Sequence, residues 1–162
     1  MGHLKAGTFF LVTAWLMLPS AGCGGGGERF ERAEVSGTIT FGGQPLREGH
    51  ITFLPMGDTR GPSSTAKIID GHYAMAEDGP VVGRHRVEIR APRKTGKKVP
   101  DLRPENRENP DRPMIDQVVE SIPVEYNTQS TLTAEIRPGK NEQNFDLTSG
   151  GREATAQANP VP

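Results

Sequence analysis

The chain has 162 residues, of which 33% are hydrophobic and 6% aromatic, and it contains 20 Gly and 14 Pro. This Gly and Pro content argues against a helical bundle, and the net charge of −1 provides no overall field that would attract nucleic acid. A single Cys excludes an internal disulfide and a cysteine-rich metal site, and the length indicates one domain.

Residues 1–22 read as an export signal. Lys5 precedes an apolar run over residues 6–18, and the small residues Ser20, Ala21 and Gly22 close the segment. A helix of that run rises only about 20 Å, less than the ~30 Å hydrocarbon core of a bilayer. We therefore expect a cleaved signal rather than a membrane span. An ordinary signal with an incidental Cys and an uncleaved anchor remain the alternatives.

The only cysteine directly follows these small residues. Ala21-Gly22-Cys23 resembles the lipobox of bacterial lipoproteins. The resemblance implies cleavage between Gly22 and Cys23 and a lipid on Cys23, so that membrane lipid is a partner of the chain. It implies an exported protein anchored to a bacterial membrane, facing the periplasm or the cell surface. In such lipoproteins, Asp directly after the lipidated Cys favours retention at the inner membrane. This chain has Gly24 there, so the resemblance favours the outer membrane. Residues 23–33 would form a glycine-rich tether.

Period-2 alternation of apolar and polar residues dominates the rest of the chain and predicts an all-β domain over residues 34–148. The hydrophobic content is too low for a thick core, so a thin two-layer sandwich is the economical arrangement. Asp70-Gly71 is a strong hairpin signal. Seven to eight short strands are expected over residues 35–41, 51–54, 66–68, 73–75, 85–90, 122–124, 132–136 and 145–147.

Two segments lack this alternation. Residues 91–116 are rich in Pro and charge and nearly free of apolar residues until Met114, so we expect a long, disordered loop; a short helix over residues 114–120 is the one competing pattern. Residues 149–162 are expected to form a disordered tail. The loop opens with a basic run that could contact anionic head groups or an acidic partner, although a solvated loop is the plainer interpretation. The run comprises Arg90, Arg93, Lys94, Lys97 and Lys98.

The order of the strand segments resembles that of carboxypeptidase regulatory-like domains. Residues 35–46, with Gly37, Gly43 and Pro45-Leu46, resemble their opening pattern, and residues 70–73 and 83–89 resemble later segments. Residues 122–147 resemble the C-terminal half of a group of small bacterial lipoproteins. The resemblance implies a seven-stranded transthyretin-like β-sandwich without catalysis of its own.

No complete catalytic set stands out. His85 and Glu88 match the His-x-x-Glu of zinc carboxypeptidases, but strand alternation sends them to opposite faces, and no His follows His85. His50, His72 and His85 could together hold zinc, yet no spacing motif brings them together. We expect no cofactor and no nucleic-acid partner.

The sequence thus predicts a non-catalytic, lipid-anchored module of the bacterial envelope that binds a protein or polysaccharide or has a structural role. The alternative is a metal-dependent or hydrolytic envelope enzyme that uses His50, His72 and His85.

Overall fold

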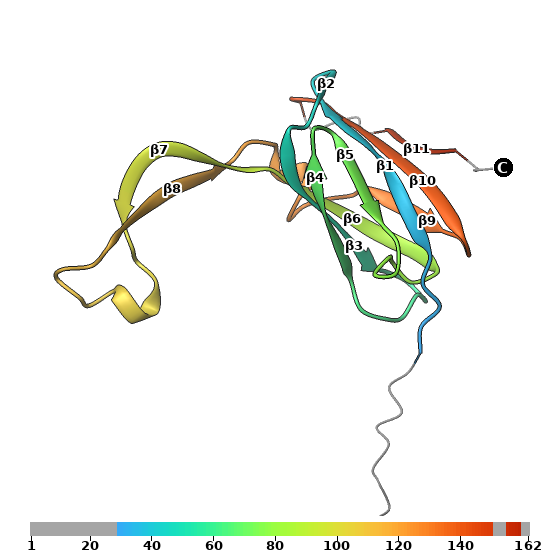
Figure 1. The fold of residues 1–162 in the computed structure, drawn as a ribbon, viewed down its shortest axis with the longest axis horizontal. Coiled ribbons are helices and arrows are strands. Elements are labelled where there is room, and N and C mark those ends of the chain that lie inside the picture. Colours follow the sequence, from blue (N-terminus) through green and yellow to red (C-terminus); the bar gives the residue numbers. More distant parts are fainter. Residues whose placement is uncertain (1–28, 151–154, 160–162) are drawn as a thin grey trace, which may run out of the picture.

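The computed structural model describes residues 29–150 and 155–159 (Figure 1). Within these residues the chain is all-β, as the alternation predicts, with two short 3-10 turns, η1 (Pro104–Asn106) and η2 (Val124–Tyr126). The strands are β1 (Glu34–Phe41), β2 (Gln44–Pro45), β3 (Glu48–Pro55), β4 (Ser64–Ile69), β5 (His72–Met75), β6 (Gly83–Arg90), β7 (Pro92–Pro100), β8 (Met114–Glu120), β9 (Thr133–Ile136), β10 (Lys140–Leu147) and β11 (Thr155–Asn159).

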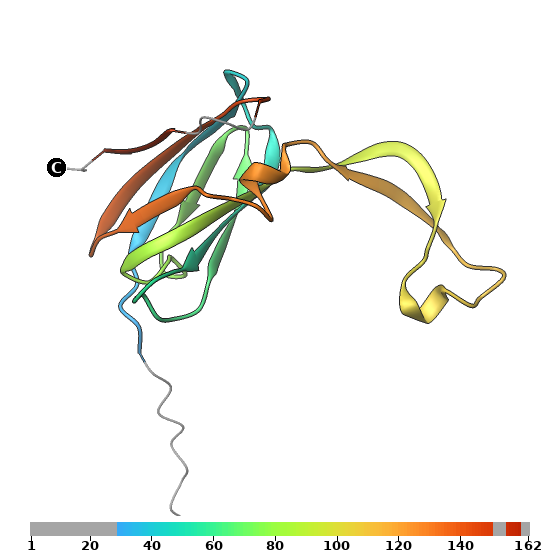
Figure 2. The ribbon, with the colours of Figure 1, turned by 180° about the vertical axis from the view of Figure 1, so that it is seen from behind.

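The main sheet curls into two layers. Its strand order is β11-β10-β1-β5-β4-β3-β6-β9, with β2 added beside β1. β4 and β5 share a single residue pair, Ile69 with His72, next to the Asp70-Gly71 turn. Both turn residues have positive φ, 48° and 80°, as a tight hairpin turn requires. Beyond this pair the two strands diverge, so that β1, β5 and β10 face β3, β6 and β9 across the core (Figures 1 and 2).

The core fills the space between the two layers. Alternate side chains of each strand point inward, as the burial patterns of β4 and β6 show. Phe53, Phe145 and Tyr73 supply its large side chains. The Tyr73 hydroxyl donates a hydrogen bond of 2.8 Å to the carbonyl of Gln143, and burial raises the pKa of this phenol. The most deeply buried aliphatic members are Val35, Ile39, Ile51, Ile68, Val87, Ile89, Ile136 and Leu147.

β1 and β10 pair in parallel, although about a hundred residues separate them in the sequence. Side chains reinforce the pairing on the outer face: Thr38 contacts Asn144, and the Thr40 hydroxyl donates to Asp146 at 2.5 Å. Gly37 permits the close approach, because a Cβ atom there would lie 1.9 Å from the carbonyl oxygen of Gln143. The opening strand and the closing strand of the core are thereby fixed to each other.

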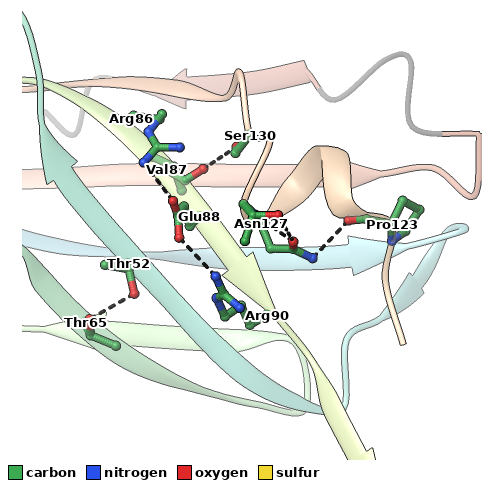
Figure 3. Close-up of polar contacts among 10 residues, drawn as sticks. Thr52, Thr65, Arg86, Val87, Glu88, Arg90, Pro123, Asn127 and Ser130 are labelled. Carbon is green, nitrogen blue, oxygen red and sulfur yellow. Dashed lines mark hydrogen bonds and ion pairs between the residues drawn. The ribbon is translucent and has the colours of Figure 1, made fainter. Parts of the chain in front are cut away.

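A turn after β8 closes the second layer against β6 (Figure 3). The Ser130 hydroxyl donates to the carbonyl of Val87, and the amide of Asn127 donates to the carbonyl of Pro123 at 3.2 Å. Residues 122–124 were expected to form a strand, but Pro123 precedes η2 instead. The apolar residues of this segment do enter the core, since Ile122 and Tyr126 are buried. A turn rather than a strand places them there.

Three further expectations differ from the structure, and so does the helical pattern noted for residues 114–120. Among the described residues, the main sheet contains nine strands rather than the seven that the resemblance implies, because the two-residue β2 and the strand β11 join it. β11 lies within residues 149–162, expected to be disordered, and pairs with β10 from Asp146 to Glu142. Residues 91–116, expected to be a long disordered loop, contain β7 and the start of β8, and residues 114–120 form a strand rather than a helix. These two strands form a separate sheet.

Candidate functional site

The most distinctive feature of the molecule is a two-stranded ribbon formed by β7 and β8, which projects away from the sandwich (Figures 1 and 2). We call residues 92–120 the arm. Its strands pair antiparallel, from Pro92 opposite Glu120 at one end to Pro100 opposite Met114 at the other, with a bulge between Lys94 and Lys98. Gly96, at φ 79°, lies within the bulge. The Thr95 hydroxyl fastens this region to β8 by donating to the Gln117 side-chain oxygen at 2.8 Å.

The arm leaves the end of the sandwich opposite to the point where residue 29 enters. Arg32 bridges to Val81 just before β6 begins, and β6 then runs the length of the layer to Arg90, where the arm starts. An eight-residue strand spans about 26 Å. The arm and the N-terminal side of the domain are therefore separated by a full strand length.

The basic residues identified in the sequence are divided between β6 and the arm. Arg90 ends β6 and lies 3.6 Å from Glu88, which also binds Arg86 at 2.8 Å (Figure 3). On the arm, Lys94 and Lys98 both contact Asp116, at 2.9 and 2.6 Å. Hydrogen bonds from Lys98 and Lys94 lower the pKa of Asp116 to about 2, and the same contact raises the pKa of Lys94.

Arg93 and Lys97 make no ion pair within the part of the chain that the structure describes. Both side chains are exposed. Of the five basic residues, these two thus have charges that none of the described carboxylates neutralises. The basic run expected from the sequence is present on the arm, but Asp116 reduces its effective charge.

The arm also exposes apolar side chains that the sequence analysis did not single out. Leu102, Met114 and Val118 are 61%, 54% and 54% exposed, and Ile115 is 37% exposed. Neither face of this sheet packs against another element among the residues described, since β7 and β8 contact chiefly each other. The apolar residues of 114–119 come in adjacent pairs rather than in alternation, so the sequence pattern did not indicate a strand there.

The tip of the arm is organised by a buried carboxylate. Asp101 has no exposed surface and accepts hydrogen bonds from the Arg103 guanidinium and, at 2.8 Å, from the Asn106 amide. The hydrogen bonds from Arg103 hold the pKa of Asp101 well below its usual range. The Asp101 amide donates to the carbonyl of Pro113 at 2.9 Å and closes the tip loop. Asp101 lies in the segment that was expected to be a disordered loop, yet its carboxylate is buried and hydrogen-bonded.

The three histidines do not come together. His50 is exposed on β3 and His72 on β5, in different layers, whereas His85 lies inside the core. Glu88 lies on the outer face of β6, so His85 and Glu88 do point to opposite faces. Within residues 29–150, no group of three His, Cys, Asp or Glu side chains could hold a metal ion.

His85 is the one buried polar side chain among the described residues with an unpaired atom. Its Nε2 has no hydrogen-bond partner, and its Nδ1 lies 3.1 Å from the carbonyl oxygen of Gly83. Burial lowers the pKa of His85, although the Gly83 carbonyl and Glu135 act in the opposite direction. A neutral imidazole in this position behaves as a core aromatic residue.

The export signal, Gly22 and Cys23 lie outside the described residues. Over the part that is described, no helix is long and apolar enough to cross a membrane. The structure thus defines an all-β, sandwich-like domain that carries a projecting ribbon. No family model, curated protein or solved structure matches the chain.

Proposed function

We propose that the chain is a non-catalytic, lipid-anchored binding module of the bacterial envelope, with a transthyretin-like core of the carboxypeptidase regulatory-like kind. Its arm is the surface that meets a protein or polysaccharide partner. The projecting arm is the observation that carries the proposal. It presents the unpaired cations Arg93 and Lys97 beside exposed apolar side chains, a combination suited to an acidic partner with some apolar surface.

The position of the arm supports a partner on the far side of the domain from the anchor. A lipid on Cys23 would hold the end of the domain where residue 29 enters, and the arm leaves the other end. This arrangement favours contact with another envelope component over contact with the head groups of the anchoring membrane. The separate positions of His50, His72 and His85 support the non-catalytic assignment.

Metabolic labelling with palmitate tests the anchor. Wild-type chain should incorporate the label and Cys23→Ala should not, because no other Cys exists to carry a thioether. Equal labelling of the two chains would overturn the lipid assignment.

Site-specific photocrosslinking in intact envelopes tests the binding surface. A photoreactive residue placed at Lys97 should give discrete adducts, whereas one placed at Thr65, an exposed position on the sandwich, should not. Adducts that are as abundant at Thr65 as at Lys97 would contradict the assignment of the arm.

A further inference from the structure

The outer edge of β8 is an open row of backbone hydrogen-bonding groups. Over residues 29–150 and 155–159, the arm sheet contains β7 and β8 and no further strand. At its two ends, the Asp101 amide donates to Pro113 and the Ser121 amide donates to Ala91. Odd-numbered residues of β8 therefore direct their backbone groups toward β7, and even-numbered residues direct theirs outward. The outward-facing residues are Met114, Asp116, Val118 and Glu120.

The two edges of the arm differ in how well they resist pairing with another strand. β7 begins and ends with Pro, contains Gly96 within a bulge, and carries four basic residues. Prolines, bulges and lysines are the usual protection of an edge strand. β8, with the sequence Met-Ile-Asp-Gln-Val-Val-Glu, has no Pro, Gly, Lys or Arg. It is a seven-residue edge without such protection.

We propose that β8 pairs antiparallel with β8 of a second copy of this chain, about a two-fold axis that passes Gln117. The two ribbons then form one four-stranded sheet, β7-β8-β8-β7. This inference concerns the open edge of β8 and does not depend on the lipid anchor or on the partner proposed for the arm.

The sequence of β8 selects this register. In an antiparallel pair related by a two-fold axis, the residue at the axis lies opposite its own copy. With Gln117 at the axis, Asp116 lies opposite Val118, and Ile115 lies opposite Val119. The outward-facing backbone groups of both copies then meet in hydrogen-bonded pairs.

Two neighbouring registers also bring the outward-facing residues of the two copies opposite each other, but both registers place like charges together. An axis at Asp116 sets this carboxylate against its copy, and an axis at Val118 sets Asp116 against Glu120 twice. Like charges directly opposite each other destabilise a strand pair. Registers farther from the centre shorten the pairing. Gln117 is thus the position at which a β8 pair is self-complementary.

The shape of the arm favours such pairing. A two-stranded ribbon that packs on nothing is marginally stable in water, whereas a sheet of more strands with apolar cross-strand pairs is stable. The exposed side chain of Ile115 would form such a pair with Val119 of the second copy. β7, with Arg93 and Lys97, remains at the two outer edges and stays accessible.

Disulfide crosslinking of the full chain in membranes tests the register. Gln117→Cys should crosslink to its copy on oxidation, because directly opposed residues have Cα atoms about 4.5–5.5 Å apart, within disulfide range. Lys97→Cys, on the adjacent strand, is the matched control, since its copy would lie at least about 14 Å away across three strand spacings. Wild type, with Cys23 as its one cysteine, gives the background.

A mixed pair makes the test independent of chance collisions. Ile115→Cys alone should crosslink weakly, because its copy is offset by four residues, about 14 Å. Co-expression of Ile115→Cys with Val119→Cys should give a strong mixed dimer. We expect at least tenfold faster crosslinking for Gln117→Cys and for the mixed pair than for Lys97→Cys or Ile115→Cys alone. Equal rates in all four would overturn the proposal.

A second measurement addresses the edge without new cysteines. Val118→Glu places a carboxylate directly opposite Asp116 of the second copy, twice in the dimer, and should convert the dimer to a monomer in analytical ultracentrifugation of the detergent-solubilised chain. Thr65→Glu, on β4 of the sandwich, should leave the dimer intact. The arm lies outside the core, so near-ultraviolet circular dichroism of both variants should match wild type. A wild-type chain that is monomeric at 100 μM, or a Val118→Glu variant that stays dimeric, would also overturn it.

Discussion

The ring of Phe53 meets the ring of His85 edge-on inside the sandwich, with centroids 6.2 Å apart and planes at 73°. The imidazole occupies an aromatic position in the core, yet its Nε2 atom has no partner there. A nitrogen buried without a hydrogen bond costs about 1–3 kcal/mol. His85→Phe should therefore raise the free energy of unfolding by about 1 kcal/mol in urea titrations at pH 7.5. A loss of stability would show that the imidazole has a partner or that the larger ring strains the core.

The same histidine should make the fold sensitive to mild acid. Burial lowers the pKa of His85 in the folded chain, so between pH 6.5 and that lower value the unfolded chain binds a proton that the folded chain does not. Stability should fall with decreasing pH over this window, by up to about 1.4 kcal/mol per pH unit. The difference between the urea midpoints at pH 7.5 and pH 5.0 should therefore be smaller in His85→Phe than in the wild type. His72 is exposed on the outer surface, so His72→Gln is the control. It should keep the pH dependence of the wild type.

Gly37→Ala should break the parallel pairing of β1 with β10. The new methyl group would lie 1.9 Å from the Gln143 carbonyl oxygen, so the strands must separate and lose the hydrogen bonds of the ladder. We expect a loss of about 3 kcal/mol or more in the free energy of unfolding. Ser36→Ala, which changes an exposed side chain on the same strand, should cost less than about 1 kcal/mol. Similar losses in the two variants would contradict the close approach.

Asp101→Asn should loosen the tip of the arm without unfolding the sandwich. The amide cannot reproduce the charged contact with Arg103, and the loop closed by Asp101 loses its organising acceptor. Amide exchange of Arg103 and Asn106, followed by NMR, should speed up at least tenfold, while exchange of core amides stays unchanged. Asp111→Asn, an exposed change on the same loop, is the control. Unchanged exchange at Asn106 would show that backbone hydrogen bonds alone hold the tip.

The free charges of the arm should dominate binding to anionic polymers. Replacing Arg93 and Lys97 with Glu removes two cations that make no ion pair within the described part of the chain, so the salt concentration needed for elution from a heparin resin should fall clearly. Replacing Lys94 and Lys98 with Glu makes the same charge change at residues already paired with Asp116. We expect a smaller shift from that second pair. Identical shifts would indicate that only net charge matters.

Burial decides which elements could be predicted from the sequence. β1, β3 and β6 each place one face in the core, so apolar and polar residues alternate along them and the strands were expected correctly. The arm buries almost nothing, and β7 therefore carries charge and Pro where a core strand would carry Val or Ile. Alternation reports burial rather than strand geometry, so a strand without a core escapes it.

The candidate site was predicted in part for a related reason. The basic residues of β7 are visible in the sequence, but their neutralisation depends on Asp116, which lies about twenty residues away and becomes a neighbour only when the ribbon pairs. Asp101 likewise looks like any loop acid until Arg103 and Asn106 fold around it. The parallel pairing of β1 with β10 joins segments about a hundred residues apart, and no local pattern specifies it.

The course of β6 has a mechanical consequence. β1 begins at the end of the sandwich where residue 29 enters, and β6 delivers the chain to the arm at the other end. Tension between these two points runs along the strands, perpendicular to the hydrogen bonds that join them. The bonds of a ladder are then loaded in shear and must fail together, whereas a pull across the strands would unzip them one at a time. The placement of the arm thus lets this thin domain resist force applied between the arm and the point where residue 29 enters.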